Sequence, residues 1–138
     1  MIVKRLAFGL LALGVLGACD PEQEAQMMFG VSASKVALVQ RANENGPVAL
    51  LTDSVLAQII ASKCASLSLD SDFYNAVGGV RRRAIFVNRE TRTAQGRARS
   101  LAFEQRHNVD LEASSNLCAA GDREIQENTV LSGHLVRN

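Results

Sequence analysis

TDSVLAQIIASKCASL, residues 52–67, carries the clearest structural pattern of the chain, because its apolar side chains recur every three or four residues. This spacing places them on one face of an α-helix, and Thr52 or Asp53 can cap the amino end of that helix. The apolar face comprises Val55, Leu56, Ile59, Ile60, Cys64 and Leu67. The segment therefore predicts an amphipathic helix that turns a cysteine toward the interior of the domain.

Helical patterns also flank this segment. On its carboxyl side, Asp70 and Asp72 supply a cap and a first-turn acid for a helix running to about Val87. Gly78-Gly79 in its middle predicts a close helix crossing or a kink, or alternatively a break between two elements. On the amino side, residues 34–43 form a short helix or, equally, residues 31–39 form a strand, and Asn45-Gly46-Pro47 ends either element.

Two more helices are predicted in the carboxyl-terminal half. Residues 90–106 have high helix propensity and a thin apolar face of Ala94, Ala98, Leu101 and Phe103, which suits a helix at the domain edge. After a polar loop over residues 108–116, Ser114 or Ser115 can cap a last helix that carries Cys118 and runs to about residue 135. No segment alternates polar and apolar residues cleanly enough to require a strand.

The composition limits the chain to one small domain. It has 138 residues and a formal net charge of +1, with 15 Lys and Arg against 14 Asp and Glu. That balance argues against a dedicated nucleic-acid binder, which needs a strong positive field, and against a highly charged disordered chain. A folded domain that binds no nucleic acid is therefore expected.

The first nineteen residues have the form of an export signal. Lys4 and Arg5 precede the apolar run 6–15, and this run with its flank is shorter than the roughly 20 residues that a spanning helix needs. Leu16-Gly17-Ala18-Cys19 resembles the lipobox of bacterial lipoproteins, in which the chain is cut before an acylated cysteine. The resemblance implies a signal peptide over residues 1–18, a lipidated tether with a possible short helix over 19–46, and a helical domain over 47–138. Ordinary secretion, with Cys19 as a free thiol, is the alternative.

The cysteine count fits this organisation. Lipidation of Cys19 leaves Cys64 and Cys118 as a pair in a compartment where disulfides persist, although two buried free thiols are the alternative. We therefore expect an all-α domain, a small antiparallel bundle of about four helices linked by one disulfide between Cys64 and Cys118. The lipid implies a membrane anchor in the cell envelope, facing the periplasm, at either the inner or the outer membrane.

The segment from Cys118 to Ile125, Cys-Ala-Ala-Gly-Asp-Arg-Glu-Ile, resembles a family of short exported alphaproteobacterial proteins of unknown function. The resemblance extends over about residues 50–138 and includes the helix that ends in a cysteine and the arginine-rich middle. The chain departs from the family in its lipoprotein-like signal and in residues 85–89, where the family often has a Gly-Tyr-Ser type of turn. It implies an exported helical domain and no activity.

Positive charge is concentrated in one part of the chain. Residues 81–106 contain eight arginines against Glu90 and Glu104. A face that binds anionic headgroups or an acidic envelope partner is one interpretation; a solvated helix face paired to the acidic residues of 108–127 is the other. The candidate residues for binding an anionic partner are Arg81, Arg82, Arg83, Arg89 and Arg92.

No catalytic, cofactor or metal-binding motif is present. The chain lacks GxSxG, HExxH and CxxC patterns, and its two histidines lie far apart in sequence. His107 is expected in a polar loop, and His134 near the end of the last helix, where it suits the helix dipole. We therefore expect a non-enzymatic envelope lipoprotein without a cofactor that binds or scaffolds another envelope component; an inhibitor or accessory subunit of an envelope enzyme, acting through the arginines, is the alternative.

Overall fold

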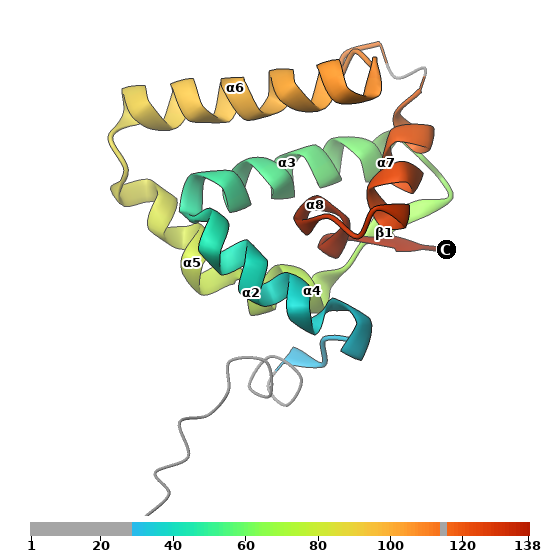
Figure 1. The fold of residues 1–138 in the computed structure, drawn as a ribbon, viewed down its shortest axis with the longest axis horizontal. Helices are drawn as coiled ribbons and strands as arrows, with labels where there is room; N and C mark the ends of the chain where they lie inside the picture. Colours follow the sequence, from blue (N-terminus) through green and yellow to red (C-terminus); the bar gives the residue numbers. More distant parts are fainter. Residues whose placement is uncertain (1–28, 114–115) are drawn as a thin grey trace, which may run out of the picture.

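The structure is a computed structural model, and it describes residues 29–113 and 116–138. Most of these residues are helical, as the sequence predicts, and two short strands complete the domain (Figure 1). The elements are, in chain order, η1 (Ala33–Lys35), α2 (Val36–Asn45), α3 (Pro47–Lys63), β1 (Leu67–Leu69), α4 (Ser71–Ala76), α5 (Gly78–Arg82), η2 (Arg83–Phe86), α6 (Arg89–His107), α7 (Leu117–Gln126), α8 (Val130–Gly133) and β2 (Leu135–Arg137).

Helix α3 is the centre of the domain. It begins at Pro47, whose fixed φ suits the first helical position, and Gly46 before it has a φ of 89° that favours glycine. Its buried residues point in several directions, and it contacts α2, α5, α6, α7, α8 and β1. A helix that is packed on most sides needs apolar side chains on most sides, which explains why residues 47–63 carry so few charges.

The interior consists of two apolar clusters on either side of α3. One packs Leu38 and Val39 of α2 and Leu50 of α3 around Phe73 of α4. The other joins Leu56 and Ile60 of α3 to residues of α6, α7, α8 and β2, which are Phe103, Leu117, Ala120, Leu131 and Leu135. The carboxyl-terminal segment therefore closes the second cluster.

The small sheet and the disulfide lie next to each other. Strands β1 and β2 are antiparallel, with Leu67 opposite Arg137 and Leu69 opposite Leu135. Cys64, directly after α3, is bonded to Cys118 on α7, and their Cα atoms are 5.3 Å apart. The predicted Cys64–Cys118 disulfide is thus present in the structure. The expectation that no strand forms is wrong for β1 and β2, which pair across 68 residues of sequence.

Several predicted boundaries need correction. Helix α3 begins at Pro47 rather than after a cap at Thr52 or Asp53, and Leu67 belongs to β1. The single helix expected to run to about residue 135 is divided into α7, α8 and β2. The helix is interrupted at Val77, between α4 and α5. This agrees with the alternative that the Gly78-Gly79 pair marks a break between two elements. Residues 36–45 are helical, and the strand alternative there is wrong.

Helix α6 lies along α3 and runs parallel to it. Arg99 of α6 contacts Asp53 in the first half of α3, and the carbonyl of Leu111, just beyond the end of α6, accepts a hydrogen bond from Lys63 at the end of α3. The ribbons of α3 and α6 accordingly run side by side in the same direction (Figure 1). An antiparallel bundle of four helices is therefore not confirmed. The face predicted for α6 is also incorrect in part, because Phe103 is buried but Leu101 is 50% exposed.

Candidate functional site

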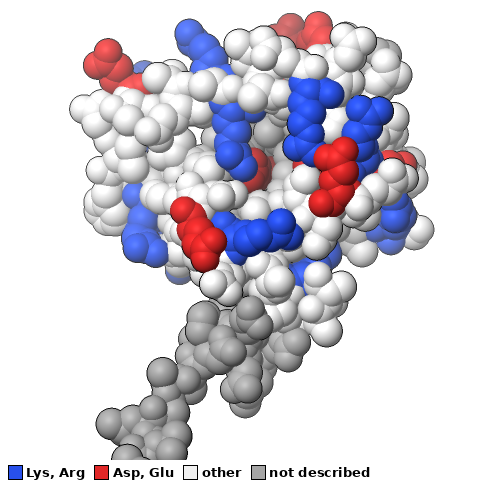
Figure 2. Space-filling view, viewed as in Figure 1, with Lys and Arg blue, Asp and Glu red and all other residues white. Residues whose placement is uncertain are grey.

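A polar pocket of about 480 Å³ opens between the end of α2, the start of α3, α6 and the α7–α8 connection. Figure 2 shows this face as a hollow with basic side chains around an acidic one. Three arginines and three carboxylates line it, above an apolar floor that includes Leu56 and Phe103. The charged lining residues are Arg41, Glu44, Asp53, Arg99, Arg106 and Glu124.

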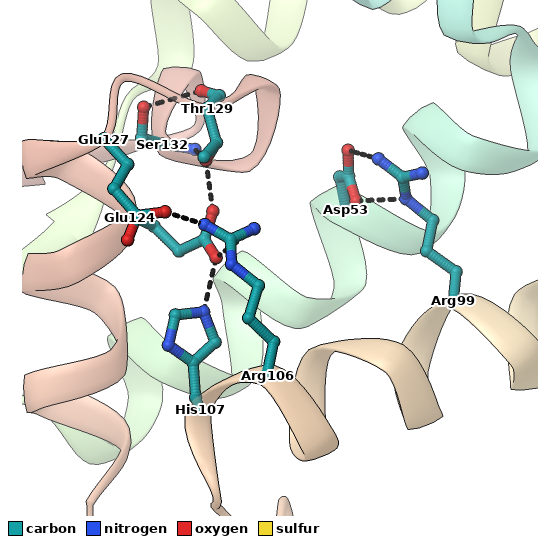
Figure 3. Close-up of polar contacts among 8 residues, drawn as sticks. All are labelled: Asp53, Arg99, Arg106, His107, Glu124, Glu127, Thr129 and Ser132. Carbon is teal, nitrogen blue, oxygen red and sulfur yellow. Dashed lines mark hydrogen bonds and ion pairs between the residues drawn. The ribbon is translucent and has the colours of Figure 1, made fainter.

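Asp53 and Arg99 form a two-point ion pair in this pocket. Arg99 donates from Nε to Oδ1 of Asp53 at 2.6 Å and from Nη2 to Oδ2 at 2.8 Å (Figure 3). The side chain of Asp53 is 2% exposed, and burial raises the pKa of this carboxyl above its usual value although Arg99 opposes the shift. Both carboxylate oxygens are occupied, so this pair fastens α6 to α3.

Glu124 is the second buried carboxylate and has three partners. Nε2 of His107 is 2.5 Å from Oε1 of Glu124, and Nη1 of Arg106 is 3.2 Å from the same oxygen (Figure 3). The hydroxyl of Thr129 donates to Oε2. Because a carboxylate only accepts, Nε2 of His107 is the donor. Nδ1 of His107 is buried and has no partner among the described residues, which favours the tautomer with its proton on Nε2.

The charged side chains of the pocket are paired mainly with one another. Asp53 and Glu124 already accept hydrogen bonds on every oxygen, and Arg106 also pairs with Glu127. Both buried carboxylates therefore make contacts within the domain. The pocket is best described as an ion-pair network that joins α6 to α3 and α7.

The structure divides the predicted arginines into two groups. Arg81 is buried: its guanidinium lies 3.4 Å from the ring centroid of Tyr74 and donates to the carbonyl of the same residue at 2.7 Å. Burial lowers the pKa of Arg81 below its ordinary value. Arg92 is half-buried and donates to the carbonyl of Ala84 at 3.1 Å. These two side chains hold the fold together.

Arg82, Arg83 and Arg89 form the second group, and all three are exposed. Within residues 29–113 and 116–138, none of them has a carboxylate within 4.0 Å. Between them, Ile85 is 69% and Phe86 is 83% exposed. We call this set of five residues, Arg82, Arg83, Ile85, Phe86 and Arg89, the basic apolar tip.

The tip belongs to a well-fixed turn. Ala84 is buried, its carbonyl accepts from the N–H of Val87 at 3.2 Å, and the Asn88 side chain caps α6 by accepting from the N–H of Glu90 at 2.9 Å. The side chains of Ile85 and Phe86 are thus presented to solvent by ordered backbone. The tip lies at the corner between α5 and α6, at the opposite end of the domain from the carboxyl terminus (Figure 1).

Most of these features could not be predicted from the sequence. Asp53, expected at a helix cap, and His107, expected in a polar loop, are both buried, and His107 is the last residue of α6. His134 lies at the end of α8, as expected for a helix end, and is also buried. The partners of Asp53 and His107 lie many residues away in sequence and leave no local signal. Ile85 and Phe86 did leave one, because a helix that turns Ala84 and Val87 inward must turn the two residues between them outward.

Some predictions fall outside what the structure tests. Cys19 lies outside the described residues. In the part of the chain that is described, no three His, Cys, Asp or Glu side chains are grouped closely enough to hold a metal ion. No described helix has the length and apolar character needed to cross a bilayer. No family model, curated protein or solved structure matches the chain.

Proposed function

We propose that the protein is a lipid-anchored protein of the bacterial cell envelope whose folded domain binds another envelope component through the basic apolar tip, without catalysing a reaction. Two features support this proposal. The segment Leu16-Gly17-Ala18-Cys19 after a basic and apolar start resembles a lipobox. The tip then supplies a surface that the domain itself leaves uncovered.

The observation that carries the proposal is the exposure of Phe86 and Ile85 on a fixed turn. Single exposed apolar residues are common on protein surfaces, but here two adjacent ones, at 83% and 69% exposure, are flanked by arginines that have no ion pair among the described residues. Arginine and aromatic residues are also enriched where proteins bind their partners. The tip thus has the composition of a contact surface.

The pocket supports the non-catalytic part of the proposal. Its two buried carboxylates accept hydrogen bonds or ion pairs from Arg99, Arg106, His107 and Thr129. General acid–base catalysis needs a group that can reach a substrate proton, and these carboxylates already serve the fold. The domain has a structural reason for each of its buried charges in this region.

Lipidation is tested by metabolic labelling with a palmitate analogue in the native host. We expect the wild-type protein to be labelled and cut before Cys19, and Cys19→Ala to lose both the label and the processing, because the acylated thiol is gone. Labelling and processing that persist in Cys19→Ala contradict the anchor.

The binding role is tested by a photo-crosslinking amino acid at position 86 in living cells. We expect covalent capture of an envelope component at position 86. The matched control carries the same amino acid at Leu101, which is also exposed but lies on the outer side of α6. Equal capture at both positions, or none at position 86, contradicts a binding surface at the tip.

A further inference from the structure

We propose that the basic apolar tip binds the anionic surface of a phospholipid bilayer, with Phe86 and Ile85 entering the interface and Arg82, Arg83 and Arg89 contacting lipid phosphates. The inference rests on the proposed function, since it names the envelope component that the tip binds. It goes further by assigning the tip a lipid partner rather than a protein.

The shape of the tip favours a bilayer. Ile85 and Phe86 project from a convex corner between α5 and α6, and they line none of the pockets described. A protein partner needs a matching concave pocket to bury such side chains, whereas the interfacial region of a bilayer accepts any protruding apolar group. Phenylalanine and isoleucine at a corner therefore match a fluid surface.

The charges around the tip point to anionic lipid. Arg82, Arg83 and Arg89 are exposed without an ion pair among the described residues, and Glu90 is the adjacent exposed acid. An arginine guanidinium can bind phosphate oxygens through two hydrogen bonds. The long aliphatic part of the side chain lets the guanidinium stay at the level of the phosphates while Phe86 and Ile85 lie deeper. A surface of phosphates thus complements the guanidinium groups while the apolar side chains enter below them.

The length of the tether permits this contact. Ten residue steps separate Cys19 from Phe29, the first described residue, and such a segment reaches at most about 35 Å. A domain of this size has a radius of gyration of about 13 Å, so the tip can reach the membrane that holds the lipid. Anchoring at Cys19 would keep the tip at a high local concentration next to that surface.

Because the backbone of the tip is already fixed, little conformational entropy is lost when the tip binds a bilayer. Arg92 holds the Ala84 carbonyl, Asn88 caps α6, and buried Arg81 fixes α5 on Tyr74. A turn that is already ordered loses little freedom when it binds, so even a small apolar contact contributes. The contacts of Arg81 and Arg92 therefore fix the backbone that carries the exposed residues of the basic apolar tip.

The test uses residues 29–138, which contain both apolar clusters, the sheet and the disulfide, and which lack the apolar leader that would bind vesicles by itself. Cooperative unfolding confirms that each variant is folded. The chain has no tryptophan, so Phe86→Trp gives a single reporter. Vesicles contain either phosphatidylglycerol mixed with phosphatidylcholine or phosphatidylcholine alone.

We expect the fluorescence of Phe86→Trp to shift to shorter wavelength, and to be quenched by brominated acyl chains, only on the anionic vesicles. Leu101→Trp, the matched control, should stay unchanged. Binding of the unlabelled segment in flotation should fall about tenfold or more in Ile85→Ser/Phe86→Ser, because apolar burial is lost. It should fall similarly in Arg82→Glu/Arg83→Glu and with added salt, whereas Arg123→Glu on α7 should bind like wild type.

Three outcomes overturn the inference. The first is no vesicle binding by a folded wild-type segment. The second is binding that depends on the arginines but not on Ile85 and Phe86, which is adsorption by charge alone. The third is capture of a protein rather than lipid by the crosslinker at position 86, and this result leaves the proposed binding function standing. The label at Cys19 is measured separately, so a failure of the anchor and a failure of the tip are distinguishable.

Discussion

Replacement of Glu124 tests whether the network around it holds the carboxyl-terminal segment to α6. Glu124 is 1% exposed and accepts from His107, Arg106 and Thr129. Glu124→Gln keeps the volume and most of the hydrogen bonds, and the loss of charge assistance should cost about 1 to 2 kcal/mol. Glu124→Leu removes all three bonds and leaves His107 buried without a partner, which should cost about 3 to 5 kcal/mol.

Urea unfolding of the purified, oxidised protein measures both values. With an m value of about 2 kcal/mol/M, Glu124→Leu should lower the unfolding midpoint by about 1.5 to 2.5 M. His107→Leu combined with Glu124→Leu should recover part of the loss, because the orphaned imidazole is removed together with its acceptor. A midpoint of Glu124→Leu equal to that of wild type would refute the interpretation of Glu124 as the centre of the network.

Three further predictions concern the interior of the domain. Gly133→Ala should lower the free energy of unfolding by about 1 to 3 kcal/mol, because the added Cβ would overlap the ring of Phe73. Gly79→Ala is the control: its Cβ meets no atom within 4 Å, so it should stabilise the domain slightly. Equal urea midpoints for the two variants would contradict this prediction. Replacing both disulfide cysteines by alanine should cost about 2 to 4 kcal/mol, and peptide mapping that finds two alkylatable thiols in the native protein contradicts the bond. Burial and the nearby Arg81 lower the pKa of His134 to about 4. In the unfolded chain the pKa of this histidine is near 6.5, so as the pH falls the unfolded state gains a proton before the folded state does. The free energy of unfolding should therefore fall by up to about 3 kcal/mol between pH 6.5 and pH 4, as measured by urea unfolding at both pH values. His134→Leu should lack this part of the pH dependence.

The helices with strong apolar periodicity could be predicted from the sequence, and their boundaries could not. The pattern over residues 52–67 located α3, but Gly46-Pro47 was interpreted only as a breaker. In the structure the same pair starts α3, since proline suits the first helical turn. Strands β1 and β2 are three residues each, which is too short for alternation to show, and their pairing depends on contacts far apart in sequence.

The two parts of the candidate site differ in how far sequence could predict them. Exposed Arg82 and Arg83 were among the candidates because a cluster of charge is visible locally. The pocket was missed, because Asp53 and Arg99 are 46 residues apart, and His107 and Glu124 are 17 apart. Nothing in the neighbouring sequence of these four residues indicates which distant residue each of them meets.

Helix α6 shows why counting apolar residues predicts its buried face only in part. Arg92, Arg99 and Arg106 recur every seven residues, which is close to two helical turns, and all three reach inward: to the Ala84 carbonyl, to Asp53 and to Glu124. Their stems cover apolar surface while their charges meet buried acceptors, so this face packs through arginine rather than through leucine. Periodicity at seven residues is as regular as an apolar stripe and equally visible in sequence. Arg89, which is on α6 but outside this series, has no carboxylate within 4.0 Å among the described residues, and neither do Arg82 and Arg83, which precede α6. Within α6, position relative to the seven-residue repeat therefore separates the arginines that pack inward from exposed ones such as Arg89, whereas Arg81 on α5 is buried through its own contact with Tyr74.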